Sequence, residues 1–324
     1  MLITAKKYML RNLVVSFLTI AALGCGKKNS AGEVFVPLPK PEEPVWTGKT
    51  DVEFWLTKPD QTVVFKKQNQ SLMFTDAINS APVITVDTTQ LFQGIDGFGY
   101  TLTGGSATLI NSLSSSQQDQ LLKELFLTDE NNIGVSYLRI AIGASDLSAA
   151  PFTYNDLPSG QTDLTLQHFN LDKERADFLP VLKKIVALYP QIKIMGSPWS
   201  PPTWMKTNNS FIGGSLKPEY YSVYAQYFVK YIQAMKAEGI TIDAITIQNE
   251  PLHDGNNPSL KMLANEQADF IKNHLGPAFR TANIQTKIVI YDHNADNITY
   301  PLNILNDADA RQYVDGSAFH LYGG

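Results

Sequence analysis

The sequence is poor in cysteine and in charge, and each shortage excludes a class of protein. Its 324 residues include one cysteine, so an intrachain disulfide and a thiolate metal cluster are both excluded. Only 18% of the residues are charged, with 26 Lys and Arg against 31 Asp and Glu. The basic residues form no cluster beyond short pairs, whereas nucleic-acid binding needs clustered positive charge. We therefore expect no nucleic-acid partner and a neutral or weakly charged ligand.

Long hydrophobic runs are also lacking, so no segment is expected to span a membrane. The most apolar stretch, 13–23, follows several basic residues, and this arrangement is typical of a secretory signal. Gly24–Cys25 at its end resembles the cleavage box of bacterial lipoproteins. We expect residues 1–24 to be a signal peptide and Cys25 to carry a lipid that anchors the protein to the membrane. The alternative is an ordinary signal that contains Cys25. The predicted location is the bacterial cell envelope, at the outer membrane.

Two segments precede the main domain. Residues 25–50 are rich in Lys, Ser, Pro and Glu, a composition that cannot bury enough surface to fold and that predicts a tether. Residues 51–92 contain short runs of β-branched and aromatic residues alternating with polar ones. These runs predict strands of a small side β-sheet, at Val52–Thr57, Thr62–Lys66 and Val83–Val86.

From residue 93 to 324, short apolar runs alternate with amphipathic segments, which is the pattern of repeated βα units. Polar and aromatic residues follow one predicted strand after another, which favours an α/β fold of the (β/α)₈ TIM-barrel type. The sequence provides about six of its βα units, so the barrel is predicted to be incomplete. The predicted strands are Gly97–Leu102, Ser136–Ile142, Ile192–Gly196, Ala244–Gln248, Ile288–Tyr291 and Ser317–His320.

Helices are predicted between these strands. Apolar residues spaced by a helical turn occur from Phe178 to Tyr189 and from Tyr221 to Met235. Ser114 and Gln117 have the spacing of a capping box at the start of another helix.

The strongest local signal for chemistry is Asn249-Glu250-Pro251, which follows an apolar strand. A carboxylic acid at the C-terminal rim of a barrel strand is where a general acid is expected. We expect Glu250 to be half-buried, with a raised pKa that keeps it protonated near neutral pH. Asn249 offers an amide that could hold a sugar hydroxyl.

A second signal is the proline-rich segment from Ser197 to Lys206, which follows the third predicted strand of the barrel. Its prolines restrict the backbone, so Trp199 and Trp204 are displayed with little loss of entropy. Indole rings suit stacking on the apolar face of a pyranose. Packing in the core is the alternative for both indoles, and more so for Trp204.

Several motifs follow one another along the chain: Gly97-Phe98-Gly99, Tyr137-Leu138-Arg139-Ile140, Ser197-Pro198-Trp199, Pro202-Thr203-Trp204-Met205-Lys206, Gly214-Ser215-Leu216, Asn249-Glu250-Pro251, and His320 with Tyr322. Together and in this order they resemble glycoside hydrolase family 30, the family of glucosylceramidases and bacterial β-1,6-glucanases. The resemblance implies a TIM barrel with a side β-sandwich and retaining hydrolysis of β-glycosides. It also implies that Glu250 is the acid/base, Asn249 its hydroxyl-binding neighbour and Trp199 a wall of the −1 subsite. His320 and Tyr322 would bind substrate at the end of the sixth strand.

The chain departs from animal glucosylceramidases at Thr103-Gly104-Gly105, where those enzymes carry an Asp after the Thr. This departure favours the bacterial β-1,6-glucanase and β-glucosidase branch, and a β-glucan or β-glucoside as the substrate. A xylanase of the same family is a less favoured interpretation.

The second carboxylate of a retaining glycosidase is not found at a matching position. The resemblance places the nucleophilic Glu on a seventh strand, beyond His320. Asp146 and Asp292 follow predicted strands, but the family positions that they match are usually assigned to support. We therefore expect a truncated, poorly folding and inactive chain, whose alternative function is noncatalytic glycan binding at the envelope. No cofactor is expected, and the pairs His253-Asp254 and Asp292-His293 lack the spacing of a metal site.

Overall fold

The structure is a computed structural model that describes residues 50–76 and 80–324. The predicted signal peptide, Cys25 and nearly all of the predicted tether lie outside the described residues. In the part that is described, no helix is long and apolar enough to cross a membrane.

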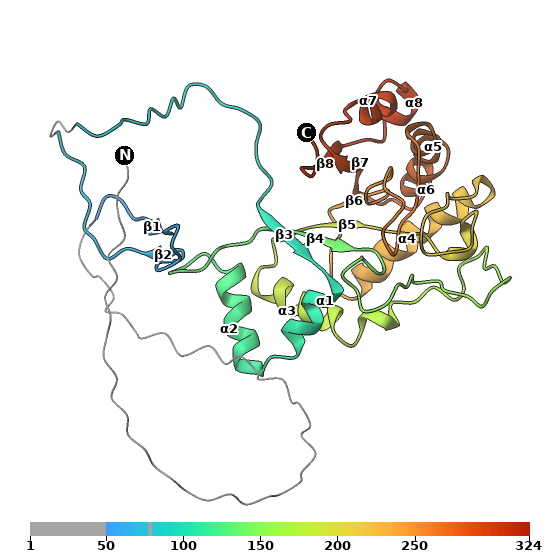
Figure 1. The fold of residues 1–324 in the computed structure, drawn as a ribbon, viewed down its shortest axis with the longest axis horizontal. Helices are drawn as coiled ribbons and strands as arrows, with labels where there is room; N and C mark the ends of the chain where they lie inside the picture. Colours follow the sequence, from blue (N-terminus) through green and yellow to red (C-terminus); the bar gives the residue numbers. More distant parts are fainter. Residues whose placement is uncertain (1–49, 77–79) are drawn as a thin grey trace, which may run out of the picture. The chain divides into compact units, whose positions relative to one another are not determined.

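A six-stranded parallel sheet forms the centre of the described chain, and its strands follow one another in sequence order (Figure 1). Every neighbouring pair is parallel, so the carboxyl ends of all the strands meet at one rim. The strands lie where the sequence predicts them, which confirms the β/α-barrel architecture. They are β3 (Gly99–Leu102), β4 (Tyr137–Ala141), β5 (Lys193–Ser197), β6 (Ala244–Thr246), β7 (Lys287–Asn294) and β8 (Gly316–His320).

Helices connect the strands and follow the same order around the sheet (Figure 1). The predicted capping box is present, because the Ser114 side chain accepts from the Gln117 N–H and the Gln117 side chain accepts from the Ser114 N–H. The helices are α1 (Gly104–Asn111), α2 (Ser115–Phe126), α3 (Phe178–Leu188), α4 (Tyr221–Ala237), α5 (Ala264–Phe270), α6 (Gly276–Thr281), α7 (Thr299–Leu305) and α8 (Ala308–Arg311).

Buried tyrosines of α4 anchor the loop that follows β4. The ring of Tyr154, in that loop, stacks on Tyr227 and Tyr231 with centroids 6.2 and 5.7 Å apart. The Tyr227 hydroxyl accepts a hydrogen bond from the Tyr154 backbone N–H. These contacts hold the loop firmly against α4, because all three side chains are buried in the core.

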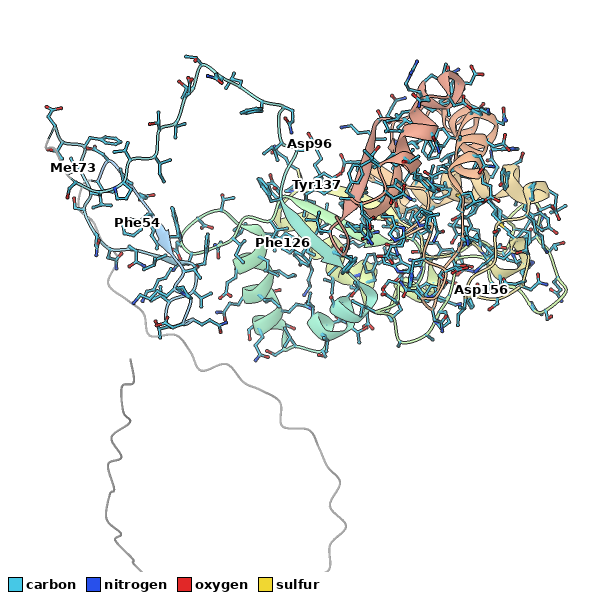
Figure 2. All side chains as sticks on the ribbon, turned by 45° about the horizontal axis from the view of Figure 1, so that its top comes forward. Phe54, Met73, Asp96, Phe126, Tyr137 and Asp156 are labelled. Atoms are coloured by element: carbon cyan, nitrogen blue, oxygen red, sulfur yellow. The ribbon has the colours of Figure 1, made fainter. Side chains whose placement is uncertain are left out.

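The segment before the sheet is only partly as predicted. A small antiparallel pair forms from β1 (Trp55–Leu56), inside the first predicted run, and β2 (Lys66–Lys67), which begins at the last residue of the second predicted run. The strand predicted at Val83–Val86 is wrong: residues 80–95 form no strand, and Val83 and Ile84 are 84% and 90% exposed. Figure 2 shows this stretch as an extended backbone between Met73 and Asp96. Its alternating pattern has no neighbouring strand to pair with among the described residues.

Candidate active site

Asn249 and Glu250 lie three and four residues after the end of β6, at the carboxyl rim of the sheet. The Asn249 N–H donates to the Pro198 carbonyl at 2.8 Å, and the Glu250 N–H donates to the Asp292 carbonyl at 2.9 Å. Glu250 has a φ of 47°, and Asp292 has a φ of 63° beside an irregularity in the β7–β8 pairing. Left-handed backbone at residues other than glycine is costly, so its clustering here indicates that the neighbouring strands hold a functional geometry.

Asp292 is the central buried charge of this rim. Its carboxylate accepts hydrogen bonds from Arg139 Nη2 at 2.7 Å, Thr246 Oγ1 at 2.7 Å and His320 Nε2 at 2.8 Å. Burial alone would raise the Asp292 pKa, but the charge of Arg139 and the bond from His320 hold it far below its usual range. Asp292 therefore stays ionised and serves to orient the groups around it.

Arg139 links this carboxylate to the other side of the site. Its Nη2 also donates to the Asn249 side-chain oxygen at 2.8 Å, and its guanidinium lies 4.9 Å from the centre of the Trp199 ring. With the oxygen of Asn249 held by Arg139, the amide nitrogen has no hydrogen-bond partner among the described residues. Asn249 is thus oriented to donate to a ligand. Trp199 is largely buried, and its indole N–H is also unpartnered.

His320 bridges the two acids. Its Nδ1 lies 3.0 Å from Glu250 Oε1, and its Nε2 lies 2.8 Å from Asp292 Oδ1. Burial favours the neutral ring, but the hydrogen bonds to Asp292 and Glu250 outweigh it and raise the His320 pKa to about 9. His320 is therefore an imidazolium at neutral pH that donates to both carboxylates.

This bridge changes the expectation for Glu250. The hydrogen bond from His320 outweighs the half-burial of Glu250 and lowers its pKa, whereas the sequence predicts a raised one. The prediction is wrong because it considered burial and not the cation at the end of β8. The other carboxylate oxygen, Oε2, accepts from the Asn256 side chain at 3.3 Å.

The two remaining predicted site residues, Tyr322 and Trp204, differ in their exposure to solvent. Tyr322 is 86% exposed, with its ring centre 6.1 Å from that of His320. Trp204 is 6% exposed and belongs to the core, where its ring packs edge-on against Tyr220 and its N–H donates to Asn155. The structure thus brings Glu250, Asn249, Trp199 and His320 together through contacts with Arg139 and Asp292, and Tyr322 lies beside His320. Trp204 occupies the position that the alternative interpretation gives it.

Sequence reasoning missed the roles of Arg139 and Thr246. A detectable signal was present, because each is a polar residue inside an otherwise apolar strand, and such a residue stays buried only with a partner. The partner itself, Asp292, is far away in sequence, so the pattern could not identify it.

Comparisons with known proteins show the family to which the chain is similar. The model of the glycosyl hydrolase family 30 TIM-barrel domain matches residues 95–324. An endo-1,6-β-D-glucanase of Neurospora crassa is 43% identical over 76% of this chain and 52% of its own length. The lysosomal acid glucosylceramidase of Mus musculus is 32% identical over 74% of the chain and 48% of its own length.

Solved structures give the same result. A structure of an endo-β1,6-glucanase superimposes with a TM-score of 0.75 and 40% identity, covering 86% of this chain and 61% of that one. A family 30 xylanase of Talaromyces cellulolyticus gives a TM-score of 0.62 and 28% identity, over 72% of this chain and 55% of that one. The chain thus spans about half the length of the curated relatives it matches.

Proposed function

The chain belongs to glycosyl hydrolase family 30, and from this membership we propose that it takes part in retaining hydrolysis of β-glucosidic bonds, with Glu250 as the acid/base. The observation that carries the proposal is the cluster at the rim, where Glu250, Asn249 and Trp199 surround the Arg139–Asp292 pair. A carboxylate, a donating amide and an indole are the groups that a neutral sugar needs for protonation, hydroxyl binding and stacking.

A β-1,6-linked glucan is the substrate we propose. Support comes from two relatives that are named endo-1,6-β-glucanases. The one from Neurospora crassa is 43% identical to this chain, and the one with a solved structure is 40% identical. The named glucosylceramidase and the named xylanase are 32% and 28% identical. The shortage of charge in the sequence also suits a neutral polysaccharide.

Glu250 is proposed to act in both steps of the reaction. In its ionised form, which His320 favours, it can take a proton from the water that releases the sugar. The protonation of the leaving oxygen needs the acid form, and a second carboxylate close by would raise the Glu250 pKa toward it. The His320 bridge therefore suits the base step and opposes the acid step in the described site.

The nucleophile is proposed to be a Glu outside this chain, on a strand that follows β8 in a longer protein. A retaining enzyme holds two carboxyl groups about 5–5.5 Å apart. Asp292 shares His320 with Glu250, but it is buried and its oxygens already accept from Arg139, Thr246 and His320. An attacking carboxylate must reach the sugar, which this arrangement does not permit. We also propose, from the sequence alone, that Cys25 anchors the protein to the cell envelope.

Hydrolysis assays of the 324-residue chain and of the protein extended through any downstream reading frame test this proposal. We expect the extended protein to release sugar from β-1,6-glucan, faster than from β-1,3-glucan, xylan or glucosylceramide, and with retained anomeric configuration by NMR. Robust hydrolysis of β-1,6-glucan by the 324-residue chain would contradict the assignment of the nucleophile. Binding of glucan without hydrolysis by both proteins would favour the alternative of a noncatalytic glycan-binding protein.

The role of Glu250 needs its own variant. In the extended protein, Glu250→Gln should slow substrates with poor leaving groups more than those with activated ones, because only the former need an acid. Glu219→Gln, at an exposed glutamate before α4, is the matched control and should leave both rates unchanged. Equal slowing of both substrate types by Glu250→Gln would remove Glu250 from the acid role.

A further inference from the structure

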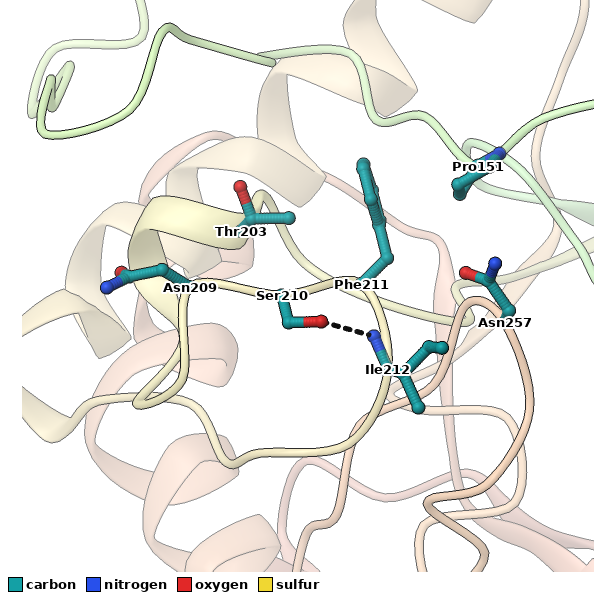
Figure 3. Close-up of a pocket in the computed structure, with 7 residues that line it drawn as sticks. All are labelled: Pro151, Thr203, Asn209, Ser210, Phe211, Ile212 and Asn257. Atoms are coloured by element: carbon teal, nitrogen blue, oxygen red, sulfur yellow. Dashed lines mark hydrogen bonds between the residues drawn. The ribbon is translucent and has the colours of Figure 1, made fainter.

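Two loops at the carboxyl rim each carry one group of the proposed site. The β5 loop, residues 198–217, contains Trp199, and the β6 loop, residues 247–263, contains Glu250. The two loops come together around one open pocket, which both of them line (Figure 3). Loops are more mobile than the strands that they follow, so the position of the indole relative to the carboxylate depends on what connects the two loops.

A buried lysine makes such a connection. Lys206, in the β5 loop, is fully buried, and its Nζ donates to the Ser259 carbonyl of the β6 loop at 2.6 Å. The same nitrogen donates to Ser200 Oγ and to the Phe211 carbonyl, each at 3.1 Å, within the β5 loop. All three acceptors are neutral oxygens, so burial of the lysine is costly. Polar groups buried at such a cost are typical of functional sites.

Backbone hydrogen bonds join the same two stretches of chain. The Ser259 N–H donates to the Phe211 carbonyl at 2.8 Å, and the Lys261 N–H donates to the Gly214 carbonyl at 2.9 Å. The Phe211 carbonyl thus accepts from the Ser259 N–H and from Lys206, which also donates to the Ser259 carbonyl. The lysine therefore closes a ring of hydrogen bonds across the two loops, and the β6 loop is held at Ser259.

The part of the β6 loop that is held in this way supports the proposed acid/base. The Met262 N–H donates to the Pro251 carbonyl at 2.8 Å, so the loop returns to a point just after Glu250. Asn256 lies between these two ends, three residues before Ser259, and its side-chain amide donates to Glu250 Oε2 at 3.3 Å. The hydrogen bonds at Ser259 therefore fix where the amide lies relative to the carboxylate.

Another of its contacts places the lysine next to the indole. Ser200, which accepts from Lys206, is the chain neighbour of Trp199, and both residues are buried. The Ser200 hydroxyl also donates to the Pro201 carbonyl at 2.9 Å, so it is held from two sides. Trp199 in turn packs against the guanidinium of Arg139. One side chain therefore connects the residue beside the indole with the loop that orients the carboxylate.

We propose that Lys206 is a positioning residue for the acid/base: it holds the β5 and β6 loops together and thereby keeps the Asn256 amide against Glu250. The inference rests on the proposed function, because that function gives Glu250 its role in the reaction. Lys206 itself is buried and does not touch the substrate, so its effect on turnover passes through Asn256 and Glu250.

Nuclear magnetic resonance of the 324-residue chain tests the geometry. In the wild-type chain, Glu250→Gln should shift the Asn256 side-chain amide resonance, because the amide then loses a charged acceptor. In a Lys206→Met background, the shift caused by Glu250→Gln should fall below about half of its wild-type size. In a Val229→Ala background it should keep its full size, because this buried residue of α4 lies outside both loops.

A milder variant covers the case in which Lys206→Met does not fold. Lys206→Gln has two N–H donors on a shorter side chain, so it can reach only part of the three oxygens. It should reduce the Asn256 response by less than Lys206→Met does. The inference is overturned if the response is absent from the wild-type chain, or if it keeps its full size in every Lys206 variant that folds. Neither result bears on the proposed function.

The dependence of turnover on the leaving group separates positioning from stability. In the extended protein, Lys206→Met should slow hydrolysis of β-1,6-glucan by about tenfold and of an activated aryl β-glucoside by less than about twofold, because only the glucan needs the acid. Val229→Ala should slow both in the same proportion, since it only lowers the folded fraction. Adding Lys206→Met to Glu250→Gln should produce no further difference between the two substrates.

The outcomes distinguish this inference from the proposed function. If Lys206→Met slows both substrates equally while Glu250→Gln still discriminates between them, the inference is overturned and the proposed function stands. If Glu250→Gln does not discriminate between them, the proposed function is overturned. The Asn256 resonance then still decides whether Lys206 positions the carboxylate.

Discussion

The segment before the sheet and the sheet itself contain similar apolar runs with opposite outcomes. Val83–Val86 and Ile288–Tyr291 are both rich in β-branched residues, yet Ile84 is 90% exposed and Ile290 is fully buried. β7 pairs with β6 and β8 and lies among helices, whereas residues 80–95 have no paired strand in the described chain. A β-pattern thus becomes a strand only where neighbours complete its hydrogen bonds and cover its face.

The ion pairs of the two regions also differ in burial. The Arg139–Asp292 pair joins β4 to β7, and its Asp side chain is 2% exposed. The Lys67–Glu53 pair joins side chains that are 36% and 53% exposed, near β1 and β2. We expect Arg139→Met to lower the free energy of unfolding by about 3–5 kcal/mol, because it leaves a buried carboxylate without its main partner. Lys67→Met should lower it by less than about 1 kcal/mol. Urea denaturation measures both, and equal effects would remove the distinction between the two regions.

Lys206 tests a buried lysine that has no carboxylate partner. Burial lowers its pKa from an ordinary value of 10.5 to about 7. Lys206→Met leaves three oxygens without a donor, at about 1–3 kcal/mol for each buried group left unpaired. At pH 9 the folded lysine has lost its proton, and the substitution removes the cost of desolvating the amine, so we expect a net loss of about 2 kcal/mol.

The lowered pKa of Lys206 also predicts how its contribution to the unfolding free energy changes with pH. Between pH 7 and 10.5 the unfolded lysine keeps a proton that the folded one has lost, so wild-type stability gains with rising pH from this group. The difference in unfolding free energy between wild type and Lys206→Met should therefore grow from pH 6 to pH 10. Lys261→Met, at an exposed lysine, should show no such trend, and a constant difference for Lys206→Met would contradict the lowered pKa.

His320→Gln tests the bridge between the acids. Without the imidazolium, the Glu250 pKa should rise from its lowered value, and a carboxyl carbon NMR titration measures this directly. The His320 pKa is raised to about 9, so its contribution to stability is fully present below pH 6.5 and is lost as the pH rises through 9. His274→Gln, on a helix away from the rim, is the control. An unchanged Glu250 pKa in His320→Gln would show that the hydrogen bond does not control the acid.

The smallest effect is expected in the exposed segment. Ile84→Ala should change the free energy of unfolding by less than about 0.5 kcal/mol, because the side chain is already in water. Ile290→Ala should cost about 2–5 kcal/mol through the cavity that it leaves in the core. A large effect of Ile84→Ala in thermal or urea denaturation would show that residues 80–95 are covered in solution.

The sequence allowed the strands of the sheet, the capping box at Ser114 and the position of Glu250 after β6 to be predicted. Each of these depends on short-range information: periodicity, a local cap, or the residue that ends a strand. The side sheet was predicted less well, because the same periodicity occurs where a strand has no partner.

What the sequence by itself determined is which residues reach the rim, since a parallel β/α repeat brings every strand end to one edge. Only the tertiary structure decided what they do there. His320 lies 70 residues from Glu250, and Arg139 lies 153 residues from Asp292, so no local pattern carries their contacts. The pKa of Glu250 depends on that distant imidazolium more than on its own burial. Electrostatic interactions act through space, and the chain places such charges together only when the whole sheet has formed.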